Sequence, residues 1–397
     1  MNYILFDSLR ENFLPLTHTR PVCDIRIGIL TIREKWEMYL NEKISILTEP
    51  YLQKKFPLRT AKQNILINGS VCPNQKLVKD ILALKSGEAL FSDETLVAVN
   101  SPTPDTSNYK STKTTKAFSL SIKNLWDIFQ RNGKAIEDDF HLLTKVPTSS
   151  GSVLWRRKKS QKISKTNSVI NSKNIFIEKG AKVEWSILNA STGPIYIGKN
   201  AEIMEGCMVR GPFSLGEHSQ LKMGAKIYGP TTVGPESKVG GEVNNSVIFG
   251  YSNKAHDGFL GNSVIAEWCN IGADSNNSNL KNNYAPVKLW NYSSEKLENT
   301  NLIFCGLIMG DHSKCGINTM FNTGTVVGVS ANIFGSGFPR NFIPDFSWGG
   351  DGGFTTYKLN DVFGTAERVF ERRNKNFNDV EKEILQRVFE ITEKFRK

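Results

Sequence analysis

An apolar residue returns at every sixth position between residues 197 and 239, and this spacing limits the folds that the chain can adopt. The aliphatic residues of this run are Ile197, Ile203, Val209, Leu215, Leu221, Ile227, Val233 and Val239. An α-helix needs a period of about 3.6 and a half-buried strand a period of about two, so a period of six fits neither element alone. It predicts a parallel β-helix, in which each flat side of a triangular coil contributes one buried aliphatic residue.

Two shorter runs extend the same period. Their members are Phe259, Ile265, Ile271, Met309, Cys315, Phe321, Val327 and Ile333. A single short strand buries little surface, but coils stacked about 4.8 Å apart share a continuous ladder of hydrogen bonds and a common core. Glycine follows several of the aliphatic residues, as at Gly198, Gly216 and Gly234, and we expect positive φ angles there, at tight corners.

Composition sets the broad class. A chain of 397 residues is long enough for two to three domains. It has no apolar run long enough for a membrane span, and its first residues lack the pattern of a signal peptide, so the sequence predicts a cytoplasmic location without membrane insertion. The net charge of +11 comes without a basic motif interleaved with aromatic residues, so no nucleic-acid partner is expected, and phosphorylated small substrates explain a basic surface equally well.

The first part of the chain, residues 1–145, reads as an α/β domain. Short apolar segments at residues 3–6, 44–47 and 65–67 are separated by helical spacing at residues 29–40. Short buried strands that alternate with helices predict a mostly parallel sheet with ligands at its carboxyl edge.

The remaining boundaries follow from composition and from the end of the repeat. We place a linker at residues 146–166, with its most flexible part at 148–152, where Ser, Thr and Gly dominate. The β-helix is expected over residues 167–340, with an interruption at 276–301. An extension at residues 341–397 carries an amphipathic helix that we expect to pack against the coils or against a neighbouring subunit.

A family resemblance enters at residues 13–21 (FLPLTHTRP), which are followed by Arg26, Ile27 and Gly28. This segment resembles the sugar-nucleotidyltransferase family. Together with residues 28–36 and 126–129 (WDIF), it looks like a divergent bacterial branch whose members also carry hexapeptide acyltransferase domains. The resemblance implies nucleotidyl transfer from UTP with Mg²⁺.

The chain departs from this family at two places. Residues 7–12 (DSLREN) stand where the family has a glycine-rich phosphate loop, so arginine and lysine side chains are the expected phosphate ligands. These candidates are Arg10, Arg20, Arg26 and Lys35. Ser70 stands where the family has a magnesium-binding aspartate, and the metal ligands are left open among Asp7, Asp24, Asp138 and Asp139.

A second resemblance lies inside the repeat, at residues 253–261 (NKAHDGFLG) and 270–274 (NIGAD). Both segments resemble the acetyltransferase half of the bifunctional enzymes that make UDP-N-acetylglucosamine. The resemblance implies that His256 is the general base and that Asn270 lines the site of the amino sugar and coenzyme A. A histidine suits proton abstraction near neutral pH, and Asp257 or a backbone carbonyl is expected to fix its tautomer.

The same resemblance supplies further candidate substrate ligands. Arg210 matches an arginine that contacts the sugar phosphate, and Asn283 and Tyr284 match an Asn-Tyr pair of the site. Lys254 is expected to serve the phosphates of the substrate or of coenzyme A. Phe259 replaces a family tyrosine, which puts one substrate hydroxyl contact in doubt.

The sequence thus predicts an α/β nucleotidyltransferase-like domain, a left-handed β-helix and a C-terminal helical segment, with handedness and a homotrimer implied by resemblance. The expected function is N-acetylation of glucosamine-1-phosphate by acetyl-CoA, followed by uridylyl transfer to give UDP-N-acetylglucosamine. Two alternatives stay open. One is a single-activity sugar acyltransferase with a degenerate first domain, and the other is a regulatory protein that binds nucleotide sugars without turnover.

Overall fold

The computed structural model describes residues 2–117, 120–147 and 155–396, so residues 148–152, predicted as the most flexible part of the linker, lie outside the described residues. The chain divides into two compact units. The first unit contains residues 1–25, 30–125 and 378–388, and the second contains residues 26–29, 126–377 and 389–397. Each unit has its own sheets.

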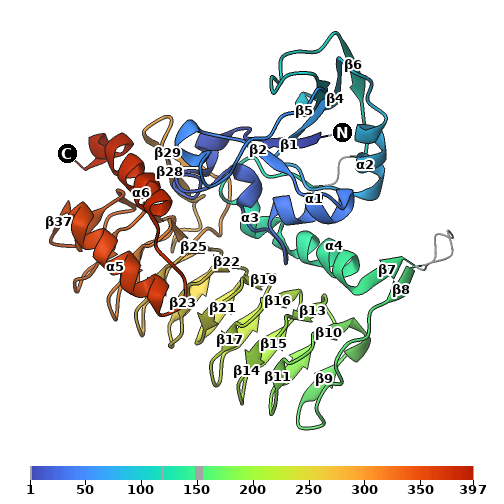
Figure 1. Cartoon of the computed structure of the whole chain (residues 1–397). Helices are drawn as coiled ribbons and strands as arrows, with labels where there is room; N and C mark the ends of the chain where they lie inside the picture. The colour runs from blue at the N-terminus through green and yellow to red at the C-terminus, as the bar shows by residue number, and fades with distance from the viewer. Residues whose placement is uncertain (1, 118–119, 148–154, 397) are drawn as a thin grey trace. The chain divides into compact units, whose positions relative to one another are not determined.

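The first unit is built on a six-stranded sheet with the strand order β2-β1-β3-β5-β4-β6 (Figure 1). Its elements are β1 (Asn2–Phe6), α1 (Ile32–Leu40), β2 (Ser45–Leu47), β3 (Asn64–Asn68), α2 (Gln75–Leu82), β4 (Glu88–Ser92), β5 (Thr95–Ser101) and β6 (Ser111–Thr114). Strand β1 is parallel to β2 and β3, whereas β5 is antiparallel to β3 and β4. The predicted strands and first helix are confirmed, and the sheet is mixed because β4 and β5 form a hairpin.

Local signals explain where α1 begins. The Thr31 side chain accepts a hydrogen bond from the backbone N–H of Glu34, and the Glu34 carboxylate accepts one from the N–H of Thr31. This capping box satisfies two donors that the first helical turn leaves unpaired. The indole N–H of Trp36 then donates to the carbonyl of Val71 at 2.7 Å, which fixes the buried face of the helix.

The second unit contains the solenoid, whose strands stack into three long sheets (Figure 1). The first sheet contains β10 (Ile175–Ile177), β13 (Ile195–Ile197), β16 (Phe213–Leu215), β19 (Thr231–Val233), β22 (Val247–Gly250), β25 (Val264–Glu267), β30 (Ile308–Met309), β33 (Val326–Val327) and β35 (Phe342–Ile343). The second contains β11 (Lys182–Val183), β14 (Glu202–Ile203), β17 (Gln220–Leu221), β20 (Lys238–Val239), β23 (Asn253–Lys254), β26 (Asn270–Ile271), β31 (Lys314–Cys315), β34 (Asn332–Ile333), β36 (Ser347–Gly350) and β37 (Gly353–Thr356). The third contains β9 (Ser168–Ile170), β12 (Ile187–Asn189), β15 (Met208–Arg210), β18 (Lys226–Tyr228), β21 (Glu242–Asn244) and β24 (Phe259–Gly261).

The other elements of the second unit connect or flank these sheets. They are α3 (Asp127–Gln130), α4 (Asn132–Thr144), β7 (Lys145–Pro147), β8 (Trp155–Arg157), β27 (Asn276–Asn277), β28 (Lys288–Asn291), β29 (Lys296–Asn299), β32 (Met320–Phe321) and α5 (Leu359–Glu371). The predicted interruption of the repeat is confirmed, because β28 and β29 form an antiparallel hairpin outside the three long sheets. Helix α6 (Asp379–Ile391) follows α5 and divides between the two units.

The period of six marks the interior of the solenoid. All eight aliphatic residues of the run from Ile197 to Val239 are buried in one continuous core. The second run is wrong at Phe259, because the residue that faces the core from β24 is Leu260, opposite Val243. The coils are shorter here. The interior residues that follow Val239 are Val243 and Ile248, which come after four and five residues instead of six. The fold class predicted from the sequence is confirmed.

The glycines after the aliphatic residues have a different reason from the predicted one. Positive φ angles do not occur at Gly198, Gly216 or Gly234; they fall two residues later, as at His218 and Glu236. A Cβ atom on Gly234 would lie 1.8 Å from the carbonyl oxygen of Phe249 in the next coil. These glycines are therefore required by the close approach of stacked backbones.

One corner of the solenoid carries aromatic side chains because stacking places equivalent residues side by side. The rings of Tyr251 and Trp268 stack with centroids 4.3 Å apart, and Trp268 stacks on Phe370 of α5 at 3.9 Å. The expected packing of a C-terminal helix against the coils is thus present. Within the described ranges, none of the helices combines the length and hydropathy that a bilayer-spanning segment needs.

Candidate functional site

Four polar residues form a column on the outward face of the second sheet. Strand pairing aligns Lys238 with Asn253, Asn253 with Asn270, and Asn270 with Lys314. Neighbouring strands lie about 4.8 Å apart, so their side chains are within reach of one another. The column therefore places two carboxamides between two ammonium groups.

This column lines a cavity of about 640 Å³ in the second unit. The cavity is lined by Lys238, Tyr251, Asn253, Ala255, His256, Trp268, Cys269, Asn270, Ile271, Gly272, Ala273, Lys314, Ile317, Val369, Arg372 and Arg373. The last three come from α5 and the turn that follows it, which lies beside these coils (Figure 1). None of these lining residues is acidic, so the cavity is strongly basic.

His256 and Asn270, the two predicted catalytic residues, both line this cavity. His256 lies in the turn between β23 and β24 with an exposed side chain. Within the described part of the chain, the structure records no hydrogen bond to its imidazole, including from Asp257. The imidazole is thus accessible to a ligand, and its proposed tautomer partner stays a prediction.

The orientation of Asn270 follows from its neighbours. Asn253 donates from Nδ2 to the Oδ1 atom of Asn270 at 3.4 Å, and Asn253 Oδ1 accepts from Arg373 Nη2 at 3.1 Å. Because the oxygen of Asn270 is engaged by Asn253, its Nδ2 donors are the atoms left for a ligand. A chain of contacts from α5 therefore orients the Asn270 amide.

Lys254 lies in the core and does not line the cavity. Its side chain takes the interior position that Val239 holds in the preceding coil, and it is 3% exposed. The ammonium donates to the His256 carbonyl at 2.7 Å. Burial lowers the pKa of Lys254 to about 8, partly offset by Asp257 and Asp274. Its geometry supports the turn that carries His256, whereas a phosphate contact from this residue stays a prediction.

The other predicted substrate ligands lie elsewhere on the solenoid. Arg210 is at the end of β15 in the third sheet, where it lines a separate groove with Met208 and Tyr228. Tyr284 is 68% exposed in the segment before β28, and the amide oxygen of Asn283 accepts from the N–H of Ala285. One copy of the chain therefore does not bring these residues to His256.

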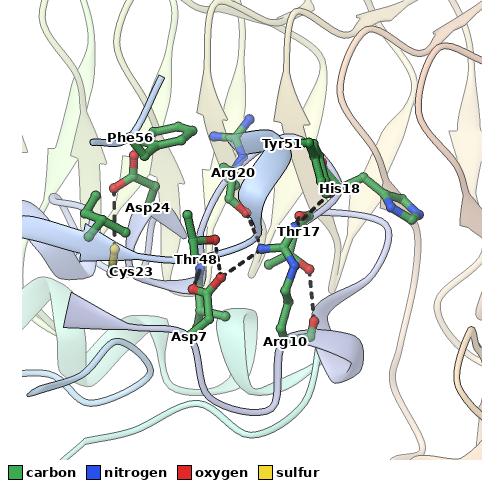
Figure 2. Close-up of polar contacts among 12 residues, drawn as sticks. Asp7, Arg10, Thr17, His18, Arg20, Cys23, Asp24, Thr48, Tyr51 and Phe56 are labelled. Carbon is green, nitrogen blue, oxygen red and sulfur yellow. Dashed lines mark hydrogen bonds and ion pairs between the residues drawn. The ribbon is translucent and has the colours of Figure 1, made fainter. Parts of the chain in front are cut away.

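In the first unit, the segment after β1 is organised around the guanidinium of Arg10 (Figure 2). Arg10 pairs with the Asp7 carboxylate at 3.0 Å and donates to the carbonyls of Thr17 and Arg20 and to the Tyr51 hydroxyl. Arg10 is 9% exposed. A phosphate loop directs backbone N–H groups at its ligand, whereas this loop directs carbonyl groups at an arginine.

The other predicted phosphate ligands are divided between the two units. Arg20 is buried and points its guanidinium away from Arg10 (Figure 2). Lys35 is buried on α1. Arg26 belongs to the second unit, where its Nε donates to the Phe249 carbonyl at 2.8 Å. Arg10, Arg20 and Lys35 belong to the first unit and Arg26 to the second, and the roles of these four cations as phosphate ligands stay predictions.

The residues at the expected metal position do not fit a magnesium site. The Ser70 hydroxyl donates to Asn68 Oδ1 at 2.8 Å, so this strand end offers amide and hydroxyl groups without a carboxylate. Asp7 accepts from Arg10, from Thr48 and from the N–H of Val22. Among the described residues, no cluster of three or more His, Cys, Asp or Glu residues has the arrangement of a metal site.

Sequence reasoning missed Lys238, Lys314, Arg372 and Arg373. The two lysines had a usable signal, since each directly precedes the interior residue of its coil, as Asn270 does. That position faces outward in every strand pair of the second sheet, and its side chains fall in one column. The arginines follow α5, far along the chain, and no local pattern connects them to this site.

The comparisons with known proteins match parts of the chain. Residues 3–147 match the family described as "Sugar nucleotidyl transferase". The chain is 37% identical over 87 residues to the "Bifunctional protein GlmU" of Methanocaldococcus jannaschii, covering 22% of this chain and 21% of that one. It is 35% identical over 144 residues to the "Bifunctional sugar-1-phosphate nucleotidylyltransferase/acetyltransferase" of Sulfurisphaera tokodaii, covering 36% of this chain and 35% of that protein.

Solved structures add a distant likeness. The UDP-N-acetylglucosamine acyltransferase of Arabidopsis is 17% identical, covers 59% of this chain and 94% of its own, and has a TM-score of 0.25. A TM-score of that size does not establish a shared fold, so the fold described above rests on the strand pairing. The matched segments span about a fifth to a third of the length of the curated relatives. The chain is therefore similar, in part and with divergence, to bifunctional sugar-1-phosphate nucleotidylyltransferase/acetyltransferases, and its residues 3–147 match the sugar nucleotidyl transferase family.

Proposed function

We propose that this protein is a transferase of nucleotide-sugar synthesis, with N-acetylation of glucosamine-1-phosphate by acetyl-CoA on the solenoid. Uridylyl transfer from UTP in the first domain then gives UDP-N-acetylglucosamine. The observation that carries the acyl transfer is the joint placement of His256 and Asn270 on one basic cavity of about 640 Å³. A cavity of this size suits a small phosphorylated substrate together with part of an acyl carrier. A cytoplasmic location stays a prediction.

The chemistry of this site is proton transfer coupled to amide formation. The amine nitrogen attacks the thioester carbonyl carbon while the His256 imidazole takes the proton that the nitrogen loses. The carbonyl oxygen becomes negative, and the role assigned to Asn270 is to stabilise it through Nδ2, an assignment supported by the engagement of the amide oxygen by Asn253. The carbon–sulfur bond then breaks, and the thiolate recovers the proton from His256. The products are an N-acetyl sugar phosphate and free coenzyme A.

The remaining predicted substrate-binding residues reach the site only if several copies of the chain assemble. Arg210, Asn283 and Tyr284 lie away from the cavity in one copy of the chain. In the proposed homotrimer, the equivalent residues of a neighbouring subunit complete the substrate site. The exposed side chains of Met208 and Tyr228 beside Arg210 favour burial of that face in an assembly.

A second candidate function is a single-activity acyltransferase whose first domain does not transfer nucleotides. The contacts of Arg10 favour it, because the loop after β1 uses its carbonyls to hold a buried guanidinium. The absence of a carboxylate at Ser70 points the same way. The family match of residues 3–147 supports nucleotidyl transfer, so the two candidates differ only in the first domain.

The experiment that tests the proposal measures both half-reactions on the full chain. Thiol release from acetyl-CoA is followed with glucosamine-1-phosphate and other amino sugars, and pyrophosphate release with a panel of nucleoside triphosphates and sugar-1-phosphates. Both signals are expected, with UTP and N-acetylglucosamine-1-phosphate as the preferred second pair. Thiol release with silence across the pyrophosphate panel favours the second candidate. Absence of thiol release with every amine rejects the acyl-transfer proposal.

A further inference from the structure

The cavity holds more positive charge than the proposed acetyl transfer uses. Lys238, Lys314, Arg372 and Arg373 all line it, while no lining residue is acidic. Among the described residues, the structure records no ion pair to any of these four side chains. Clustered cations without counter-charges repel one another, so the arrangement is stabilised when an anion binds.

Three of these cations gather at one end of the column. Arg373 Nη2 lies 3.1 Å from Asn253 Oδ1, and Asn253 is the strand neighbour of Lys238. Arg372 precedes Arg373 directly and lines the same cavity. Burial lowers the pKa of Lys238, with further lowering by Arg373, Lys222 and Arg372, as expected when these charges lie close together. Lys238 on β20 and the two arginines after α5 therefore lie close together in the cavity.

The helix end that carries the arginines is held in place on the solenoid. Phe370, two residues before Arg372, is buried and stacks on Trp268 with centroids 3.9 Å apart. Phe377 packs edge-on against Phe370 from the other side of the turn, at 5.3 Å. An anchored turn loses less conformational freedom when its side chains bind a ligand, which favours affinity.

We propose that Lys238, Arg372 and Arg373 form a phosphate-binding subsite for the organic phosphate that reacts in this cavity. The planar guanidinium groups supply paired N–H donors that match phosphate oxygens, and the lysine adds a point charge. The proposal rests on acyl transfer at this cavity and assigns a binding role to the turn after α5, which lies outside the solenoid coils. It also explains why the lining contains cations from two parts of the chain.

Two reactants of the proposed reaction carry suitable phosphate groups, the sugar phosphate and the acyl carrier. The shared chemistry is a phosphate monoester or diester, and the binding experiment separates the sources. Calorimetric titrations of the full chain use glucosamine-1-phosphate against glucosamine, and coenzyme A against pantetheine, which lacks the nucleotide phosphates. Each titration is made at low and high ionic strength.

The variants are Lys238→Gln, Arg372→Gln and the double change Arg372→Gln with Arg373→Gln. Arg368→Gln is the matched control, since Arg368 lies one turn earlier in α5 and lines a different groove. We expect each arginine change to lower the affinity for the phosphorylated ligand by about tenfold, because a charged hydrogen bond is lost. The ligand without phosphate and the control variant are expected to keep their affinities. Salt dependence is expected to flatten in the double variant.

The outcomes separate clearly. A lower affinity of the variants for coenzyme A alone, or for glucosamine-1-phosphate alone, supports the subsite and identifies its ligand. Equal affinities in the double variant and in the Arg368→Gln control overturn it, as does failure of the native chain to bind either phosphorylated ligand at millimolar concentration. Because Lys238 and Arg372 have no recorded hydrogen bond from their side chains among the described residues, their single changes are not expected to affect folding.

Binding and turnover can also fail separately. If phosphate binding depends on the arginines while no thiol is released from acetyl-CoA, the subsite stands and the acyl-transfer proposal fails. If acetyl transfer proceeds in the double variant with unchanged KM for both substrates, the subsite fails and acyl transfer stands.

Discussion

Two regions of the molecule use arginine in opposite ways. In the first unit, Arg10 is buried and donates hydrogen bonds to Asp7, to two backbone carbonyls and to Tyr51 (Figure 2). In the second unit, Arg372 and Arg373 face a cavity whose lining residues include no acid. The first arrangement satisfies a guanidinium within the protein, and the second leaves guanidinium groups for a ligand.

The role of a basic residue near a candidate site depends on the contacts that its side chain already makes. A basic residue in a sequence motif becomes a phosphate ligand only if its donors are not already used by the fold. Arg10 stands where the resembling family has its phosphate loop, yet its contacts hold that segment together. Arg372 stands in a segment without a motif, yet it lines the cavity with His256.

The largest effect is expected from His256→Ala. Loss of a general base lowers the rate of acetyl transfer by about a hundredfold to ten-thousandfold. Thiol release under saturating acetyl-CoA measures it, and His218→Asn is the control because His218 is an exposed histidine at another corner of the solenoid. Equal rates in both variants would contradict the assignment of His256 as the general base of acetyl transfer.

The second effect tests the other side of the comparison. Arg10→Gln is expected to lower the unfolding free energy of the first unit by about 3 kcal/mol, because it leaves Asp7 and buried carbonyls without their partner. Urea unfolding measures the change, and Lys62→Gln, an exposed residue of the same unit, is the control. Unchanged stability together with lost nucleotide binding would show instead that Arg10 serves a ligand.

The third prediction concerns the buried lysine under His256. The pKa of Lys254 falls from 10.5 to about 8 on folding, so between these values the unfolded chain binds more protons than the folded one. Its contribution to stability therefore rises with pH through this window. Lys254→Met removes the cost of the buried charge, up to about 3 kcal/mol at neutral pH, a gain that shrinks between about pH 8 and pH 10.5 and is absent at higher pH.

The same variant is expected to lose activity as it gains stability. Without the Lys254 ammonium, the His256 carbonyl loses its 2.7 Å hydrogen bond and the turn is less firmly held. We expect kcat for acetyl transfer to fall by about tenfold with little change in KM. Thermal unfolding and initial rates are measured on the same preparation. A variant that is both less stable and fully active contradicts this account.

The smallest effect is expected from Asn253→Ala. This change removes the contact that engages the Asn270 oxygen and the contact from Arg373. Acetyl transfer is expected to fall by about threefold to tenfold, since each contact is a single hydrogen bond at an accessible site. Asn332→Ala, in the same column of the second sheet but outside the cavity lining, is the control. A drop of equal size in the control would show that the column matters only for folding.

The fold was predictable to the extent that burial repeats. The period of six located the core of the solenoid because one interior residue per strand must be apolar, as Leu215 and Val233 show. It failed at Phe259, because shortened coils shift the interior position and a fixed period cannot follow them. The hairpin β4–β5 was missed for a related reason, since the prediction considered only strands that alternate with helices.

The site was predictable only where its residues lie in one short segment. His256 and Asn270 are one coil apart, so the resemblance could place both, and the structure puts them on one cavity. Lys254 is two residues before His256 in the chain, but strand alternation turns its side chain into the core. The helix that completes the cavity depends on the stacking of Phe370 on Trp268, a contact between distant segments that local patterns do not encode.

The stacked coils have a consequence for the range of molecules that such a protein can accept. Lys238 and Lys314 are separated by three strand intervals of one sheet, so their spacing is a whole number of steps of about 4.8 Å. Insertion or removal of one complete coil between them changes the distance between the two charges by one step and leaves each local environment intact. Ligand length in such a solenoid can therefore change only in increments of about one coil spacing.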